Sequence, residues 1–216
     1  MNSAFLPDLD ALKTAHLEPI VAAGQTSLLG DTATDRTTML QVALANELGV
    51  SELAAAWIAS TPELDVKLAF ARQVGDEASH FRLVADRLTA LGFDVADFRP
   101  PAANPLFAYL RGLEHTVERI AAGLYTLESI AHGVNENFMA FSERAGDAET
   151  VRIYREHIQP DELHHQRLGH ALLAKYAANS ASQQRAKEVV TRVLEIATAT
   201  RATAAAKMGT ACFPGC

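Results

Sequence analysis

A glutamate followed three residues later by a histidine occurs twice in this chain, in Glu77–His80 and in Glu162–His165. On an α-helix, residues three apart lie on one face about one turn apart, so each copy offers a carboxylate oxygen and an imidazole nitrogen side by side. These are the two ligand atoms that a helix can most readily present to one metal ion. His164 points about 100° away from His165, so we expect His165 to share the face of Glu162.

A lone glutamate inside an apolar run precedes each copy, Glu47 before the first and Glu128 before the second. An isolated charge in an apolar core costs several kcal/mol, so four glutamates on inward helix faces need compensation, which two divalent cations would supply. Carboxylate and imidazole ligands without a thiolate suit iron or manganese. For any one of these residues alone, a solvent-facing glutamate or a hydrogen-bonded core histidine is the simpler interpretation. The repetition of the whole set favours a dinuclear metal site.

The elements that must position these residues are helices, because apolar residues recur at helical spacing and no segment alternates convincingly as a strand. The first two glutamate-bearing helices are expected over about 35–60 and from Thr61 to Gly92. The third, as one helix or a broken pair, begins near Asn104 and ends at about Arg144, and the fourth covers about 148–178. Residues 93–103 form a long crossover between the two hairpins. The four glutamates then lie about 20–27 Å from the hairpin turns, at comparable depth. This order predicts an all-α four-helix bundle.

Further helices are expected at both ends of this core bundle of about residues 35–178. A leading helix runs to about Ala23 and is followed by a connection, and a C-terminal helix covers about 180–207. A flexible tail over 208–216 ends the chain. A length of 216 residues fits a single domain, residues 1–216, better than two.

In the order and spacing of these residues, the chain resembles the ferritin-like diiron-carboxylate superfamily, whose bundles surround a metal pair with this ligand pattern. The resemblance covers about residues 35–178. It implies a ferritin-like bundle that binds two Fe ions, with Mn as an alternative. One ion would be held by Glu47, Glu77 and His80, and the other by Glu128, Glu162 and His165. One glutamate of each Glu-x-x-His motif would bridge the two ions.

An aspartate directly precedes both motifs, Asp76 in the first and Asp161 in the second. Both match the aspartate that often stands at this place in bacterial multicomponent monooxygenases. There it holds the outer nitrogen of a ligand histidine and so fixes the orientation of the ring. A surface position on the helix is the alternative for each of them.

Three further residues near the second hairpin's ligands are of interest. Tyr125 and His132 each lie about one turn from Glu128 and could belong to the surroundings of the metals, although core packing explains either residue as well. Pro160 lies inside the fourth helix and removes a backbone hydrogen bond two residues before Glu162. We therefore predict a kink or a π-bulge at Pro160.

Composition excludes several classes of function. A net charge of −7 disfavours a nucleic-acid-binding surface, and 49% hydrophobic with 21% charged residues is typical of a globular protein. We identify no apolar run of the roughly 20 residues that a membrane span needs and no signal peptide at the start, so a cytoplasmic protein is expected. Cys212 and Cys216 are expected to be incidental thiols on a frayed end rather than a redox loop or a metal site.

The resemblance implies an enzyme that activates O2. Iron-storage ferritins resemble the chain less, because their site has a single Glu-x-x-His, and the paired Cys-x-x-Cys module of rubrerythrins is missing here. We therefore expect a non-haem diiron oxidoreductase that oxidises or hydroxylates an unidentified small or apolar organic substrate, with an electron-donor protein as a further partner. The alternative is a non-catalytic iron-binding or scaffold protein, linked to iron sequestration or stress. The final helix either pairs two copies into a homodimer or lies across its own bundle.

Overall fold

The computed structural model describes residues 4–30, 35–100 and 104–215, and no strand occurs within these ranges. The α-helices are α1 (Phe5–Leu29), α2 (Arg36–Ser60), α3 (Leu64–Ala90), α4 (Pro105–Arg111), α5 (Thr116–Ile120), α6 (Glu128–Arg144), α7 (Ala148–Ile153), α8 (Gln159–Tyr176) and α9 (Ser180–Met208). A short 3-10 helix, η1 (Val95–Asp97), lies in the crossover, and two π-helical segments, η2 (Ala121–Leu127) and η3 (Tyr154–Ile158), interrupt longer helices. The prediction of an all-α fold is confirmed.

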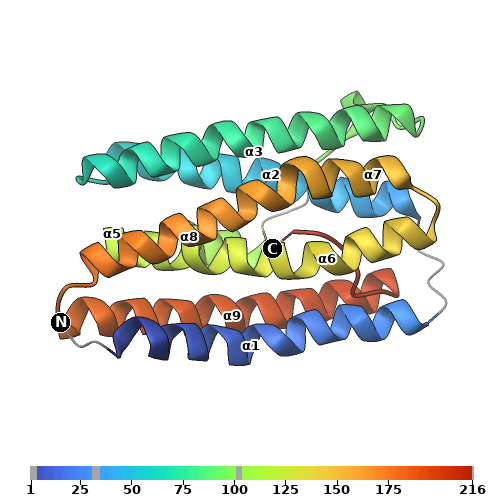
Figure 1. Ribbon diagram of the computed structural model, residues 1–216. Helices are drawn as coiled ribbons and strands as arrows, with labels where there is room; N and C mark the ends of the chain where they lie inside the picture. Colours follow the sequence, from blue (N-terminus) through green and yellow to red (C-terminus); the bar gives the residue numbers. More distant parts are fainter. Residues whose placement is uncertain (1–3, 31–34, 101–103, 216) are drawn as a thin grey trace.

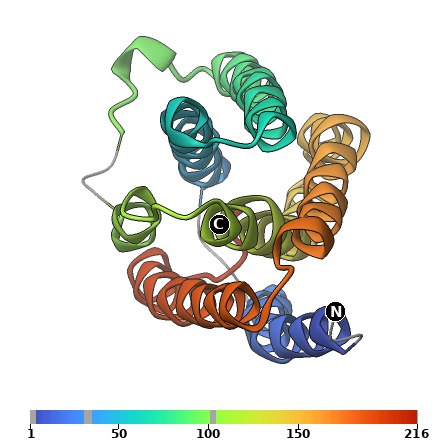
Figure 2. The same cartoon turned by 90° about the vertical axis from the view of Figure 1, so that its left-hand side faces the viewer.

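Two helical hairpins form the bundle. The first consists of α2 and α3, and the second of the continuous runs α5–η2–α6 and α7–η3–α8 (Figure 1). Seen along the helices, η2 and α6 lie near the centre, with α1 and α9 on the side opposite α2 and α3 (Figure 2). All residues from 119 to 131 are buried as a result. The final helix α9 packs on η2 and α1 of its own chain.

The leading helix α1 extends past its predicted end at Ala23 because Gly24 does not break it. A Cβ at Gly24 would lie only 2.3 Å from Nδ2 of Asn137 on α6. This glycine therefore leaves room for the side chain of Asn137, which donates to the carbonyl of Val21 at 2.9 Å, and it remains helical. The predicted stop at Gly92 is confirmed, since Gly92 has a φ of 89° directly after α3.

The start of α3 differs from the prediction in one detail. The second helix was expected to begin at Thr61, but the hydroxyl of Thr61 donates to the carbonyl of Trp57 at 2.8 Å, so this residue belongs to the end of α2. Glu63 is the residue that precedes α3. In the crossover, Asn104 caps α4 by accepting a hydrogen bond from the amide of Leu106, and residues 101–103 lie outside the described ranges.

The predicted irregularity at Pro160 is confirmed. The π-helical segment η3 ends at Ile158, two residues before this proline. Pro160 has no N–H, so a carbonyl of the preceding turn loses its α-helical partner, and a wider turn accommodates that loss. A second π-helical segment, η2, directly precedes Glu128 and has no proline to announce it.

A flexible tail was predicted over 208–216, but Thr210 and residues 212–215 are buried, so the prediction is wrong for these residues. Arg201 of α9 donates to two tail carbonyls at 2.6 and 2.8 Å, and Asn46 of α2 donates to a third at 3.1 Å. The chain end consequently lies at mid-length of the helices (Figure 1). The thiol of Cys212 is buried 3.3 Å from a carbonyl of α1, whereas Cys216 lies outside the described residues.

Among the described residues, α2 alone is long and apolar enough to cross a membrane by length and composition. The run-length criterion applied to the sequence missed this helix. Its residues Leu40, Leu44, Leu53 and Trp57 are buried between the other helices of the bundle. Core packing therefore accounts for its apolar composition.

Candidate metal centre

The predicted ligands lie where two apolar clusters of the core meet. We call them the Trp57 cluster, which includes Phe70 and Val50, and the Phe138 cluster, which includes Leu44 and Val84. The glutamate-bearing helices run through both clusters. On α2, for example, Leu44 and Val50 stand on opposite sides of Glu47 and belong to different clusters. The acidic centre is thus enclosed by apolar side chains at both ends.

The structure brings all six predicted ligands together, and all are buried: Glu47 from α2, Glu77 and His80 from α3, Glu128 from α6, and Glu162 and His165 from α8. They form two groups, in each of which one ligand atom per residue lies within 4.8 Å of the others. One group is Glu47, Glu77, His80 and Glu162, and the other is Glu77, Glu128, Glu162 and His165. Because Glu77 and Glu162 belong to both groups, they are placed as bridging carboxylates would be.

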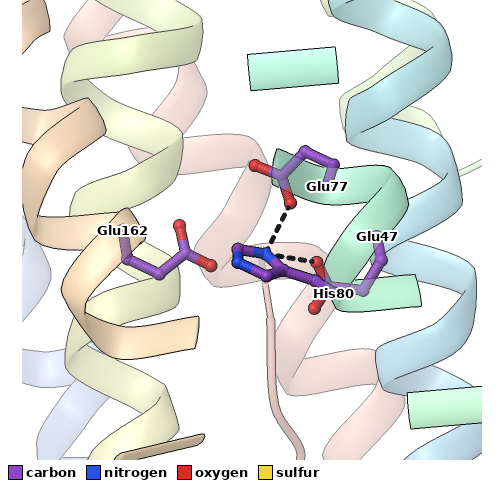
Figure 3. A group of neighbouring side chains, drawn as sticks. All are labelled: Glu47, Glu77, His80 and Glu162. Carbon is purple, nitrogen blue, oxygen red and sulfur yellow. Dashed lines mark hydrogen bonds and ion pairs between the residues drawn. The ribbon is translucent and has the colours of Figure 1, made fainter. Parts of the chain in front are cut away.

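The histidines turn their Nδ1 atoms toward the carboxylates. Nδ1 of His80 lies 3.2 Å from Glu77 and 3.4 Å from Glu47, and Glu162 points toward this ring from α8 across the bundle (Figure 3). Nδ1 of His165 lies 3.6 Å from Glu77. The inner ring nitrogens are therefore the atoms that would ligate a metal.

The outer Nε2 atoms are held by the two aspartates, but across the bundle. Nε2 of His80 lies 3.3 Å from Asp161, and Nε2 of His165 lies 3.0 Å from Asp76. Each aspartate thus contacts the histidine of the other motif. This exchange ties α3 to α8, and a ring that donates Nε2–H to the aspartate would bind a metal through Nδ1 once Nδ1 has lost its proton.

Burial in the metal-free centre favours protonated carboxyl groups. Loss of water raises the pKa of Glu128 to about 8, and it raises the pKa values of Glu77 and Glu162 well above the usual range, with further repulsion among the carboxylates. Burial alone would lower the pKa of His80, but hydrogen bonds to Glu47 and Glu77 outweigh it and raise that pKa to about 12. The centre therefore holds protons where a dication would otherwise sit.

Several inward-facing atoms lack a hydrogen-bond partner among the described residues. They include Oε1 of Glu77, Oε2 of Glu162 and Nδ1 of His165. Buried polar atoms without partners are rare, and each calls for an explanation such as an ion or a water molecule. All three belong to the group that contains Glu128. The oxygen and nitrogen donors, the four carboxylates and the open atoms fit the binding of metal ions.

Two residues predicted as neighbours of the metals lie elsewhere. The hydroxyl of Tyr125 donates to Asp10 on α1, and burial together with that carboxylate raises the tyrosine's pKa. His132 is half-buried and belongs to neither ligand group; its carbonyl accepts a hydrogen bond from Gln159 at 3.1 Å. For these two side chains, packing was the better of the two interpretations.

Two other residues reach the centre without having been singled out. Gln73 is buried one turn before Glu77, and its amide donates to Glu128. Its signal in the sequence is an amide that lies one turn after Phe70 and one turn before Glu77, on the inward face of α3. Tyr154 is fully enclosed, and its hydroxyl has no hydrogen-bond partner among the described residues.

Glycine 169 sets the distance between α8 and η2. A Cβ at Gly169 would lie 2.7 Å from backbone atoms of Leu124 and Tyr125, a contact that no side chain tolerates. The absence of a side chain thus lets the helix that carries Glu162 approach the one that carries Glu128. Close approach of these backbones helps both carboxylates to reach one centre.

The family of the chain follows from residues 21–204, which match the family described as "Protein of unknown function (DUF455)". This match covers far more than half of the chain. The chain belongs to the DUF455 family. All six clustered residues lie inside the segment matched to DUF455, as does the crossover. No curated protein and no solved structure matches the chain. For this DUF455 protein, function must therefore be argued from the centre itself.

Proposed function

We propose that this DUF455 protein is a ferritin-like diiron oxidoreductase that activates O2 to oxidise or hydroxylate a small or apolar organic substrate. One observation carries the proposal: two buried ligand groups share Glu77 and Glu162, so that two ions could be held side by side and bridged. Nitrogen and oxygen ligands suit Fe, with Mn as the other candidate. When bound, a ferrous pair would supply electrons for the reduction of O2.

The chain's own residues position the ions and protect the centre. Glu47 and His80 would complete one ion's ligands, and Glu128 and His165 the other's. The aspartates orient the two rings through Nε2, which raises the basicity of the inner nitrogens. The surrounding apolar clusters exclude bulk water, and this strengthens the electrostatic interactions inside the centre.

Metal content of the purified protein tests the binding part. We expect about two ions per chain in the wild type and loss of metal in Glu77→Ala and His165→Ala, because each removes a ligand from a four-residue group. His164→Ala is the matched control, since this neighbouring histidine is exposed and lies outside both groups. Equal metal content in His165→Ala and His164→Ala would contradict the assignment.

Reaction with O2 separates the enzyme from a non-catalytic iron-binding or scaffold protein. The protein loaded with Fe(II) is mixed with O2 in a stopped-flow spectrophotometer. For an oxygenase, we expect a transient visible absorption that forms after mixing and decays within minutes. If two irons are bound but the spectrum does not change on exposure to O2, the scaffold alternative holds and the oxygenase proposal is rejected.

A further inference from the structure

Tyr154 is a buried phenol whose hydroxyl has no hydrogen-bond partner among the described residues. It is only 1% exposed and belongs to the Phe138 cluster, where its ring packs edge-on against Phe138 at 5.0 Å. A buried hydroxyl without a hydrogen-bond partner lowers the free energy of unfolding, so its presence calls for an explanation such as a bound water molecule or ion. The rest of this cluster is apolar apart from the Cys212 thiol, which donates to a carbonyl of α1.

The backbone sets the helix face on which Tyr154 lies. In a regular α-helix, Tyr154 would lie about 80° from Glu162 around the helix axis, since the two are eight residues apart. The π-helical segment η3 spans the first half of this interval, and its wider turn advances each residue by only roughly 80°. Tyr154 and Glu162 consequently lie within about 20° of each other, on the face that carries the metal ligands.

The electrostatic surroundings agree with this placement. Burial raises the pKa of Tyr154 well above its usual range, and the negative charges of Glu47 and Glu162 raise it further. The phenol therefore keeps its proton and can only donate or accept a hydrogen bond as a neutral group. Glu47 and Glu162 both belong to the group that contains His80. Glu162 belongs to both groups, but Glu47 belongs only to this one, so we assign the hydroxyl to the group that contains His80.

We propose that Tyr154 is a positioning residue of the metal centre, whose hydroxyl donates a hydrogen bond to a water or hydroxide ligand on the ion held by the Glu47, Glu77, His80 and Glu162 group. The inference rests on the proposed metal binding but not on oxygenase activity. No covalent change of the tyrosine is involved.

Tyr154→Phe removes the hydroxyl and leaves the ring. Because the hydroxyl is unpartnered without metal, we expect the metal-free variant to melt at the wild-type temperature or higher. With metal, the variant loses a hydrogen bond, so we expect Mn(II) to bind about twofold to tenfold more weakly in anaerobic titration calorimetry and to raise the melting temperature less than in the wild type. The two measurements together separate a contact to the bound ligand from a packing effect.

Tyr125→Phe is the matched control. It removes the hydroxyl of another buried tyrosine, one that already donates to Asp10, and so should lower the melting temperature equally with and without metal while leaving Mn(II) affinity unchanged. If Tyr154→Phe binds Mn(II) within twofold of the wild type, or destabilises the metal-free protein as Tyr125→Phe does, the inference is overturned. If the wild type itself binds no Mn(II) or Fe(II), the proposed function fails together with it.

Discussion

Loading the centre with metal should displace protons, and their number can be worked out from the structure. The pKa of Glu128 is raised to about 8 by burial, and that of His80 to about 12 by Glu47 and Glu77. At pH 7 a carboxyl group with a pKa of about 8 is about nine-tenths protonated, and the imidazole is fully protonated. Metal ligands must be deprotonated, so both protons leave when ions bind.

The expected release is therefore about two protons per chain from these two residues alone. Glu77 and Glu162, whose pKa values are also raised, add to this number. Linkage between proton and metal then gives a steep dependence on pH. Metal affinity should rise by about 100-fold or more per pH unit between pH 6 and 7, because each released proton contributes a factor of ten.

Titration calorimetry in two buffers of different ionisation enthalpy at pH 7 measures the proton count directly. Glu128→Gln provides the internal comparison. The amide cannot titrate, so this variant should bind more weakly and release about one proton fewer than the wild type. A wild-type release below one proton, or an affinity that does not change between pH 6 and 7, would refute the reasoning on the buried centre.

The same pKa shifts determine whether the stability of the metal-free protein rises or falls with pH. Glu128 has a folded-state pKa above its unfolded value of 4.5. Its contribution to the free energy of unfolding is fully present below that unfolded value and is lost as pH rises through about 8. Metal-free protein should therefore melt at a lower temperature at pH 8 than at pH 5, and bound metal should reverse this trend by displacing the protons.

Two further substitutions test how the centre is supported. Asp76→Asn should weaken metal binding about tenfold to 100-fold without unfolding the protein, because the carboxylate orients His165 through Nε2; unchanged affinity in a metal titration would contradict that role. Gly169→Ala should lower the free energy of unfolding by about 1–3 kcal/mol, since its methyl group meets the backbone of Leu124, whereas Gly75→Ala on the exposed face of α3 should be neutral or stabilising. Chemical denaturation compares the two, and equal effects would show that the close approach is not needed.

Local spacing indicated a metal site, and the resemblance to diiron-carboxylate bundles then implied its ligand set. A carboxylate and an imidazole three residues apart share a helix face, and comparable distances from the two hairpin turns bring Glu47, Glu77, Glu128 and Glu162 to similar depth. Convergence also requires each helix to turn its glutamate inward, and the apolar runs around Glu47 and Glu128 indicated that orientation. The all-α bundle was predictable for the same reason, because helical periodicity and turn residues are local properties.

Contacts between distant segments were not predictable in this way. The tail was expected to be mobile, but Arg201 on α9 and Asn46 on α2 hold its carbonyls in the core. A short terminal segment with glycine and proline carries no sign of such partners. Likewise, the sequence places Asp161 beside His165, yet the aspartate reaches His80 because α3 and α8 face each other across the bundle.

The two π-helical segments explain why the wrong tyrosine was considered for the metal centre. With α-helical turns, Tyr125 would lie about 60° from the face of Glu128, but the wider turn of η2 moves it to more than about 100° and toward Asp10 on α1. The segment η3 has the opposite effect on Tyr154 and rotates it from about 80° to within about 20° of Glu162. One irregularity thus removes a phenol from the centre and the other supplies one. Pro160 indicates η3 in the sequence, whereas no residue indicates η2. Only the rotation of Tyr154 therefore had a local signal.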